Sequence, residues 1–281
     1  MVNFLRQLRF QFNIFLQEKI HWLLFILGLI FLFTSANFRN NDTFSPAYIN
    51  SICGGIFLFT SIVYGVFATR FFLMEVSNQS QIQWVRSGFR TTFITVKFFA
   101  AFFGVLVLLL PTLVIMLISG ASFNSFAGLL HGATVWVYLF VPTFLFVTAL
   151  SIFSGLLFRK PALAMTFTLL CLIGNVIRQT SWQDLLMYLP AGVYGLLFGY
   201  GPIRETLQLN RGYFLCLSIS LLLLALLIGH FVLPANKGKL KWKDAGIWLF
   251  LVLFFIAGTY FLGSRLNYQG WFIVVAPALE T

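Results

Sequence analysis

Long apolar runs separated by shorter polar segments dominate this chain. The runs cover about residues 21–36, 47–73, 95–118, 128–157, 162–177, 212–233 and 245–262. A helix needs about 20 apolar residues to cross the hydrocarbon core of a bilayer, where its backbone groups must be satisfied internally. The pattern predicts an all-α, polytopic helical membrane protein with about six to seven transmembrane helices.

The composition agrees with this prediction. The chain is 60% hydrophobic and 9% charged, whereas about a quarter of the residues of a soluble domain are charged. The net charge of +11 would suggest a nucleic-acid partner for a soluble protein. Here most of the basic residues lie between the apolar runs or at their ends, so we expect no nucleic-acid partner.

The placement of Lys and Arg predicts the orientation. Thirteen of the 18 lie before the first run or near the gaps that follow the second, fourth and sixth runs, and the other five lie near the alternate gaps. Cytoplasmic segments carry the excess of Lys and Arg. We predict a multi-pass protein of the cell (inner or cytoplasmic) membrane, with a cytoplasmic N-terminus and an external C-terminus. The short external tail, 264–281, is expected to lie at the outer interface.

Residues 3–19 form an amphipathic pattern ahead of the first run. One side of a helical wheel carries apolar residues, with Arg6 and Arg9 beside them: Phe4, Leu5, Leu8, Phe12, Phe15 and Leu16. Such a pattern is typical of a helix that lies in the membrane surface and contacts its lipids. The alternative is a cytoplasmic extension of the first span.

Residues 75–92 belong to the longest polar stretch predicted to lie inside the cell. Ile82, Val85 and Phe89 have the spacing of one helical face, and Trp84 flanks them. A short amphipathic helix with exposed apolar residues is typical of a docking element for a cytoplasmic partner. The alternative is a helix that rests on the bilayer or on its own bundle.

An apolar but interrupted segment lies within residues 179–211. Pro190, Gly192, Gly195 and Gly199 break the stretch 185–200, so it is too irregular for a full span. We expect re-entrant outer half-helices here, since irregular backbone at membrane depth has to be shielded by protein.

The sequence lacks two common motifs for nucleotide binding and metal binding. There is no Gly-x-x-x-x-Gly-Lys-Ser/Thr phosphate loop and no His-Glu-x-x-His metal pair. All seven Asp and Glu fall in loops or at span ends, whereas ion-coupled transporters use carboxylates inside the membrane. We therefore expect no enzyme, no cofactor and no metal in this chain, and energy supplied by another protein.

The order of these elements resembles the permease subunits of type 2 ABC transporters, the exporter class. The most specific stretch contains Glu75, an Asn78-Gln79-Ser80 triplet, the mainly apolar helical stretch 82–85, the turn Gly88-Phe89-Arg90, and Lys97 at the opening of the third span. Gln79 stands where the family usually has Gly, and Gly88 where it usually has Pro. The resemblance covers residues 1–233; segment 234–281 adds a basic cytoplasmic loop, a seventh span and the tail.

The resemblance implies a function. A second permease chain, identical or related, would complete the pathway, and two cytoplasmic ATPases would bind ATP and Mg. The ATPases would dock on the coupling helix 75–92, through Glu75, Ile82, Trp84, Val85, Arg86, Phe89 and Arg90. The alternative is a non-transporting membrane protein, such as a sensor or an assembly scaffold.

Overall fold

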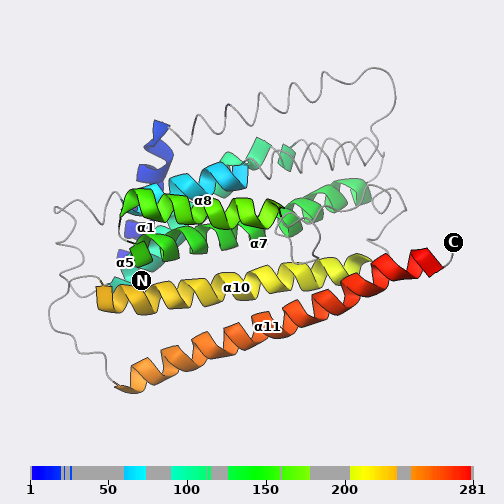
Figure 1. Ribbon diagram of the computed structural model, residues 1–281. Coiled ribbons are helices and arrows are strands. Elements are labelled where there is room, and N and C mark those ends of the chain that lie inside the picture. Colours follow the sequence, from blue (N-terminus) through cyan, green and yellow to red (C-terminus); the bar gives the residue numbers. More distant parts are fainter. Residues whose placement is uncertain are drawn as a thin grey trace.

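The structure, a computed structural model, describes residues 2–19, 22, 26, 60–73, 90–111, 113–114, 126–158, 160–177, 203–232 and 242–279. These residues are nearly all helical, and no strand occurs among them. The helices are α1 (Val2–Gln17), a helix over Thr60–Leu73, α5 (Arg90–Leu108), α7 (Phe126–Phe158), α8 (Pro161–Ile177), α10 (Ile203–Val232) and α11 (Trp242–Leu279) (Figure 1). The all-α prediction is therefore confirmed for the described part of the chain.

Three of these helices are long and apolar enough to cross a membrane. The segments are Phe140–Phe158 in α7, Gln208–Gly229 in α10 and Gly246–Arg265 in α11. Shorter apolar helices lie at Thr60–Leu73, Thr92–Leu108 and Pro161–Ile173. These lengths and compositions make the chain a helical membrane protein; the full number of spans stays a prediction.

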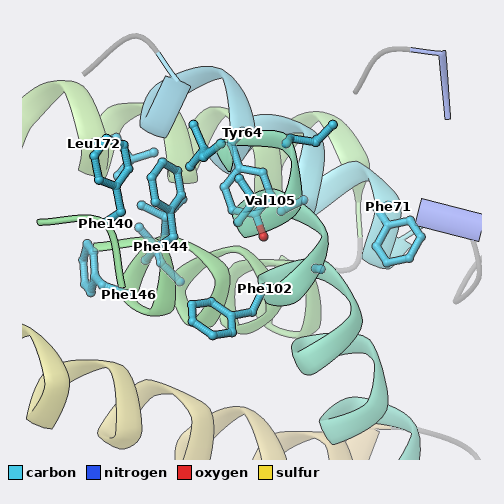
Figure 2. Packing of buried hydrophobic residues seen from close by; sticks show 14 of the residues in the cluster. Tyr64, Phe71, Phe102, Val105, Phe140, Phe144, Phe146 and Leu172 are labelled. Carbon is cyan, nitrogen blue, oxygen red and sulfur yellow. The ribbon is translucent and has the colours of Figure 1, made fainter. Parts of the chain in front are cut away.

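The buried core consists of two clusters that follow one another along the bundle. The first cluster contains Tyr64, Val105, Phe144 and Leu172, and the second contains Leu73, Ile94, Leu156 and Ala164, each with further apolar residues. Figure 2 shows the first cluster, in which aromatic rings from α7 and from helix Thr60–Leu73 face one another between α5 and α8.

The direction of the helices alternates along the chain. Helix Thr60–Leu73, α7 and α10 pass from the first cluster into the second as their residue numbers rise, whereas α5 and α8 pass from the second into the first. α11 is antiparallel to α10, because Gly258 lies beside Cys216 and Leu262 lies beside Gly212. Alternation of this kind is what successive membrane crossings require.

α11 packs at the edge of the bundle. In Figure 1 it runs beside α10, which separates it from α7. Apolar side chains are exposed along most of it, including Ile247, Phe250, Phe254 and Phe261. A surface of this composition fits a lipid environment.

Helix ends differ from the predicted bounds at several places. α10 begins at Ile203, so the last part of segment 179–211, predicted to lie on the outer side, is helix. The stretch 185–200, expected to form re-entrant half-helices, lies outside the described residues. α11 continues to Leu279, so the tail expected after the seventh span belongs to the same helix. A helix can continue through polar residues, because it depends on backbone hydrogen bonds. An apolar run predicts only the part of the helix that crosses the membrane, so it can be shorter than the helix.

Proline accompanies irregular backbone geometry just after the end of α5. The backbone N–H of Leu109 is shared between the carbonyl oxygens of Val105, at 3.0 Å, and Leu106, at 3.2 Å, two residues before Pro111. The chain becomes helical again from Leu110. A proline cannot donate a backbone hydrogen bond, and the preceding turn tightens to compensate. Pro142, by contrast, lies inside the continuous helix α7.

Candidate functional site

The predicted coupling helix falls largely outside the described residues. Glu75, Ile82, Trp84, Val85, Arg86 and Phe89 lie between the two described segments, and Arg90 is the first residue of α5. The structure therefore leaves the docking role of these residues a prediction. It does describe both flanking helices, Thr60–Leu73 and α5, which position the two ends of the segment.

Lys97 joins these two flanking helices. Its side chain projects from α5 and is 1% exposed. The Nζ atom donates a hydrogen bond to the Phe71 carbonyl oxygen at 3.2 Å and lies 4.1 Å from the Phe71 ring centroid and 5.7 Å from that of Phe93. A buried ammonium is costly unless polar and aromatic groups surround it, and each cation–π contact contributes about 0.5 to 2 kcal/mol. Lys97 thus holds α5 against helix Thr60–Leu73, and these two helices flank residues 74–89 in the sequence.

Phe15 anchors α1 in the same region. It is 0% exposed, and its ring makes edge contacts with Phe71 at 5.3 Å and with Tyr64 at 6.4 Å between ring centroids. Gly104 of α5 makes the close approach possible, because a Cβ atom there would overlap the Phe15 ring. We name this arrangement of Phe15, Tyr64, Phe71 and Gly104 the Phe15 socket. It attaches α1 to both helices that flank the predicted coupling segment.

A seam of buried hydroxyl groups continues inward from the socket. The Tyr64 hydroxyl and the Thr148 Oγ1 are 2.8 Å apart, and Ser151 Oγ donates to the Gly65 carbonyl oxygen at 2.9 Å. Further along, Thr168 Oγ1 lies 2.7 Å from Ser154 Oγ and 3.1 Å from Thr69 Oγ1. We call these six side chains, Tyr64, Thr69, Thr148, Ser151, Ser154 and Thr168, the hydroxyl seam. It links helix Thr60–Leu73, α7 and α8.

Gly65 allows these helices to approach closely at the seam. A Cβ atom there would lie 2.6 Å from Leu172 Cδ1 and 3.0 Å from Val147 Cγ1. Small residues at helix interfaces let membrane helices pack backbone to backbone, and hydroxyl groups then bond across the contact. Helix Thr60–Leu73, α7 and α8 therefore pack closely against one another at the level of the first cluster.

A second buried cation lies on α10. The Arg211 side chain is 2% exposed, and its guanidinium donates to Thr143 Oγ1 of α7 at 3.1 Å. Thr143 follows Pro142 directly, so the contact lies where the proline interrupts the backbone hydrogen bonds of α7.

The predicted membrane-facing side of α1 is divided in the structure. The helix itself is observed over Val2–Gln17. Phe15 is enclosed by the bundle, Phe4, Leu8, Phe12 and Leu16 are half-buried, and Leu5 is 58% exposed. The expectation that the whole arc contacts lipid is therefore wrong for Phe15. Lipid and protein interior are equally apolar, so the sequence pattern cannot distinguish them.

Sequence reasoning did not identify the hydroxyl seam or the Phe15 socket. Lys97 was placed only at the opening of the third span, although a lysine inside an apolar run is a recognisable signal. Ser and Thr spaced three residues apart in the fourth run, at Thr148, Ser151 and Ser154, could also have indicated a helix contact. Phe15, Tyr64 and Gly104 carry no such signal, because their contact depends on tertiary packing.

No grouping of three or more His, Cys, Asp or Glu side chains that could hold a metal occurs among the described residues. That the chain binds no cofactor stays a prediction.

Comparison of the chain with protein-family models, with curated protein sequences and with solved structures found no match. The proposals below therefore depend on the sequence pattern and on the geometry of the described helices.

Proposed function

We propose that this chain is the membrane-spanning permease subunit of an ATP-driven ABC exporter. A second permease chain, identical or related, forms the translocation pathway with it. A dimer of cytoplasmic ATPase subunits binds ATP and Mg and docks on residues 75–92. The ATP chemistry belongs to the partner, and this chain is not an enzyme.

One observation supports the proposal more than any other. The surface helix α1 and the two helices on either side of segment 75–89 are joined through Phe15, Phe71 and Lys97. A force applied to that segment would pass into α1, α5 and helix Thr60–Leu73 together. Coupling of this kind requires packed elements between the docking segment and the bundle.

The hydroxyl seam extends this connection into the bundle. Tyr64 contacts Phe15 on one side and Thr148 of α7 on the other. α7 in turn contacts α8 and α10. A displacement at the predicted cytoplasmic end can therefore reach the middle of the bundle through contiguous side chains, as alternating access demands.

The absence of a buried carboxylate from the described spans also favours an external source of energy. The fully buried polar residues of the described spans include neutral hydroxyl groups and the cations Lys97 and Arg211, but no carboxylate. Proton- and sodium-coupled transporters generally place carboxylates at this depth.

Co-purification tests the proposal. The chain is expressed in its native host with an affinity tag and extracted in a mild detergent. We expect it to bring down a protein that carries a Gly-x-x-x-x-Gly-Lys-Ser/Thr phosphate loop, in equal molar amount with the permeases. Purification without any such protein would instead favour a sensor or an assembly scaffold.

A further inference from the structure

The side of α1 that faces away from the bundle is basic at its centre and apolar at its borders. Its exposed residues are Leu5, Arg6, Arg9, Phe10, Asn13 and Gln17. At 3.6 residues per turn they span an arc of roughly 140°, with Arg9, Asn13 and Arg6 in the middle. Leu5, 58% exposed, and Phe10, 57% exposed, lie at its two edges. We name this the outward face of α1.

The opposite side of α1 is already occupied by the bundle. Gln11 and Phe15 are buried there, and Phe15 fills its socket on α5 and helix Thr60–Leu73. This attachment fixes the rotation of α1 about its own axis. Arg6 and Arg9 therefore point away from the protein for as long as Phe15 stays in place.

The charge on the outward face is uncompensated within the described part of the chain. Arg6, Arg9 and Lys19 are exposed, and none forms an ion pair with a described acidic residue. Glu18, the described acidic residue nearest in sequence, is half-buried. A surface of this kind attracts anions, and guanidinium groups bind phosphate oxygens with two parallel hydrogen bonds.

Trp22 indicates the depth at which this surface lies. Its indole Nε1 donates to the Leu16 carbonyl oxygen in the last turn of α1 at 2.7 Å, and the side chain is 50% exposed. Tryptophan favours the headgroup level of a bilayer. Since Trp22 is tied to the end of α1, its preference favours the same level for the helix, where one apolar edge of the outward face can reach the boundary of the acyl chains.

We propose that the outward face of α1 binds the phosphate groups of anionic membrane lipids through Arg6 and Arg9. Trp22 and the apolar edge nearest the bilayer hold the helix at headgroup depth, and the two guanidinium groups then select acidic over neutral headgroups. Each basic side chain near an acidic leaflet increases binding roughly fivefold. Lipid binding by α1 does not require an ATPase partner, so it can be tested independently of the transport function.

The test measures lipid preference at the outward face of the whole chain in bilayers. The three native cysteines are replaced, and a fluorophore is attached to a cysteine at Asn13, between the two arginines. The bilayers contain phosphatidylcholine and phosphatidylglycerol, of which one or the other carries brominated acyl chains that quench on contact. We expect an anionic preference on the order of tenfold, decreasing at about 0.5 M salt because the charges are exposed.

Matched variants assign the preference to the two arginines. Arg6→Gln with Arg9→Gln should bring the ratio close to one, whereas Arg6→Lys with Arg9→Lys should retain most of it. Arg265→Gln removes an exposed charge from α11 and should leave the ratio unchanged. Equal quenching by both lipids in the original chain would overturn the proposal, and so would a preference that survives the double glutamine substitution. Absence of quenching by either lipid would place this face in water or against another protein, and would overturn it as well.

Discussion

At the residue scale, Lys97 and the hydroxyl groups of the seam are each satisfied by specific neighbours. Lys97 has a carbonyl oxygen and two aromatic rings, and each hydroxyl of the seam has a carbonyl or a second hydroxyl within 3.1 Å. An unsatisfied polar group in this environment would cost about 1 to 3 kcal/mol. Substitutions that remove one partner should therefore have measurable effects.

Lys97→Met is expected to lower stability by about 1 to 3 kcal/mol. Methionine preserves the length of the side chain but removes the hydrogen bond to Phe71 and both cation–π contacts. Thermal unfolding in detergent measures the loss. Lys160→Met is the matched control, because Lys160 is an exposed residue just before α8. Equal unfolding midpoints for the two variants would contradict the role assigned to Lys97.

Gly104→Ala should displace Phe15 from its socket. The new methyl group would overlap the Phe15 ring, and overpacking of this kind costs about 1 to 3 kcal/mol. Gly246→Ala is the control, since nothing lies within 4 Å of a Cβ atom at Gly246, and alanine favours helix more than glycine does.

A double-mutant cycle shows whether Phe15 causes the effect of Gly104→Ala. With Phe15→Ala already present, the added methyl group should have little effect, because the ring it would overlap is gone. Additive losses of stability would mean that α1 does not pack on Gly104 as described.

At the element scale, the sequence predicted the existence of helices better than their ends or their partners. The fourth and fifth runs, 128–157 and 162–177, agree with α7 and α8 within a few residues, because apolarity covers the whole of each helix. α10 and α11 extend well beyond their apolar windows, since a helix continues where hydrogen bonding allows. The hydroxyl seam depends on tertiary contacts, so its only trace in the sequence is a weak periodicity of Ser and Thr.

Thr168→Val tests whether the hydroxyl seam holds its helices together. Valine has the same shape but removes the contacts of Thr168 with Ser154 and Thr69. Interhelical hydrogen bonds in membranes average about 0.6 kcal/mol and reach about 1.7 kcal/mol, so we expect a loss in that range. The free energy of unfolding in mixed micelles provides the measurement.

Thr259→Val is the matched control for the seam. The Thr259 hydroxyl bonds to the Phe255 carbonyl oxygen of its own helix at 2.8 Å, so its removal breaks the same kind of bond without separating two helices. If both variants are equally stable, the seam does not contribute to helix association.

At the scale of the whole molecule, the alternation of helix direction and the asymmetry of charge agree with one topology. Helix Thr60–Leu73 and α7 both run toward the second core cluster, and the exposed basic residues Arg70 and Lys160 lie toward that end. The positive-inside rule predicts that this end is cytoplasmic. An odd number of spans would then place the C-terminus outside.

A reporter that is active only in the cytoplasm tests this orientation. Fused after Thr281, it should be silent, whereas a fusion between α7 and α8, at Lys160, should be active. Activity after Thr281 would show that the number of spans before it is even.

Binding of an ATPase through segment 75–92 is the most direct test of the transport function. Buried aromatic anchors dominate such interfaces, each costing on the order of 2 kcal/mol or more when truncated, whereas exposed ion pairs contribute under about 1 kcal/mol. We predict that Trp84→Ala or Phe89→Ala detaches or uncouples the ATPase while the protein still inserts in the membrane, and that Arg86→Ala is milder. Pull-down of the ATPase and its activity in the reconstituted complex are the measurements. Full binding and full activity in both aromatic variants would contradict the assignment of this segment as the coupling element.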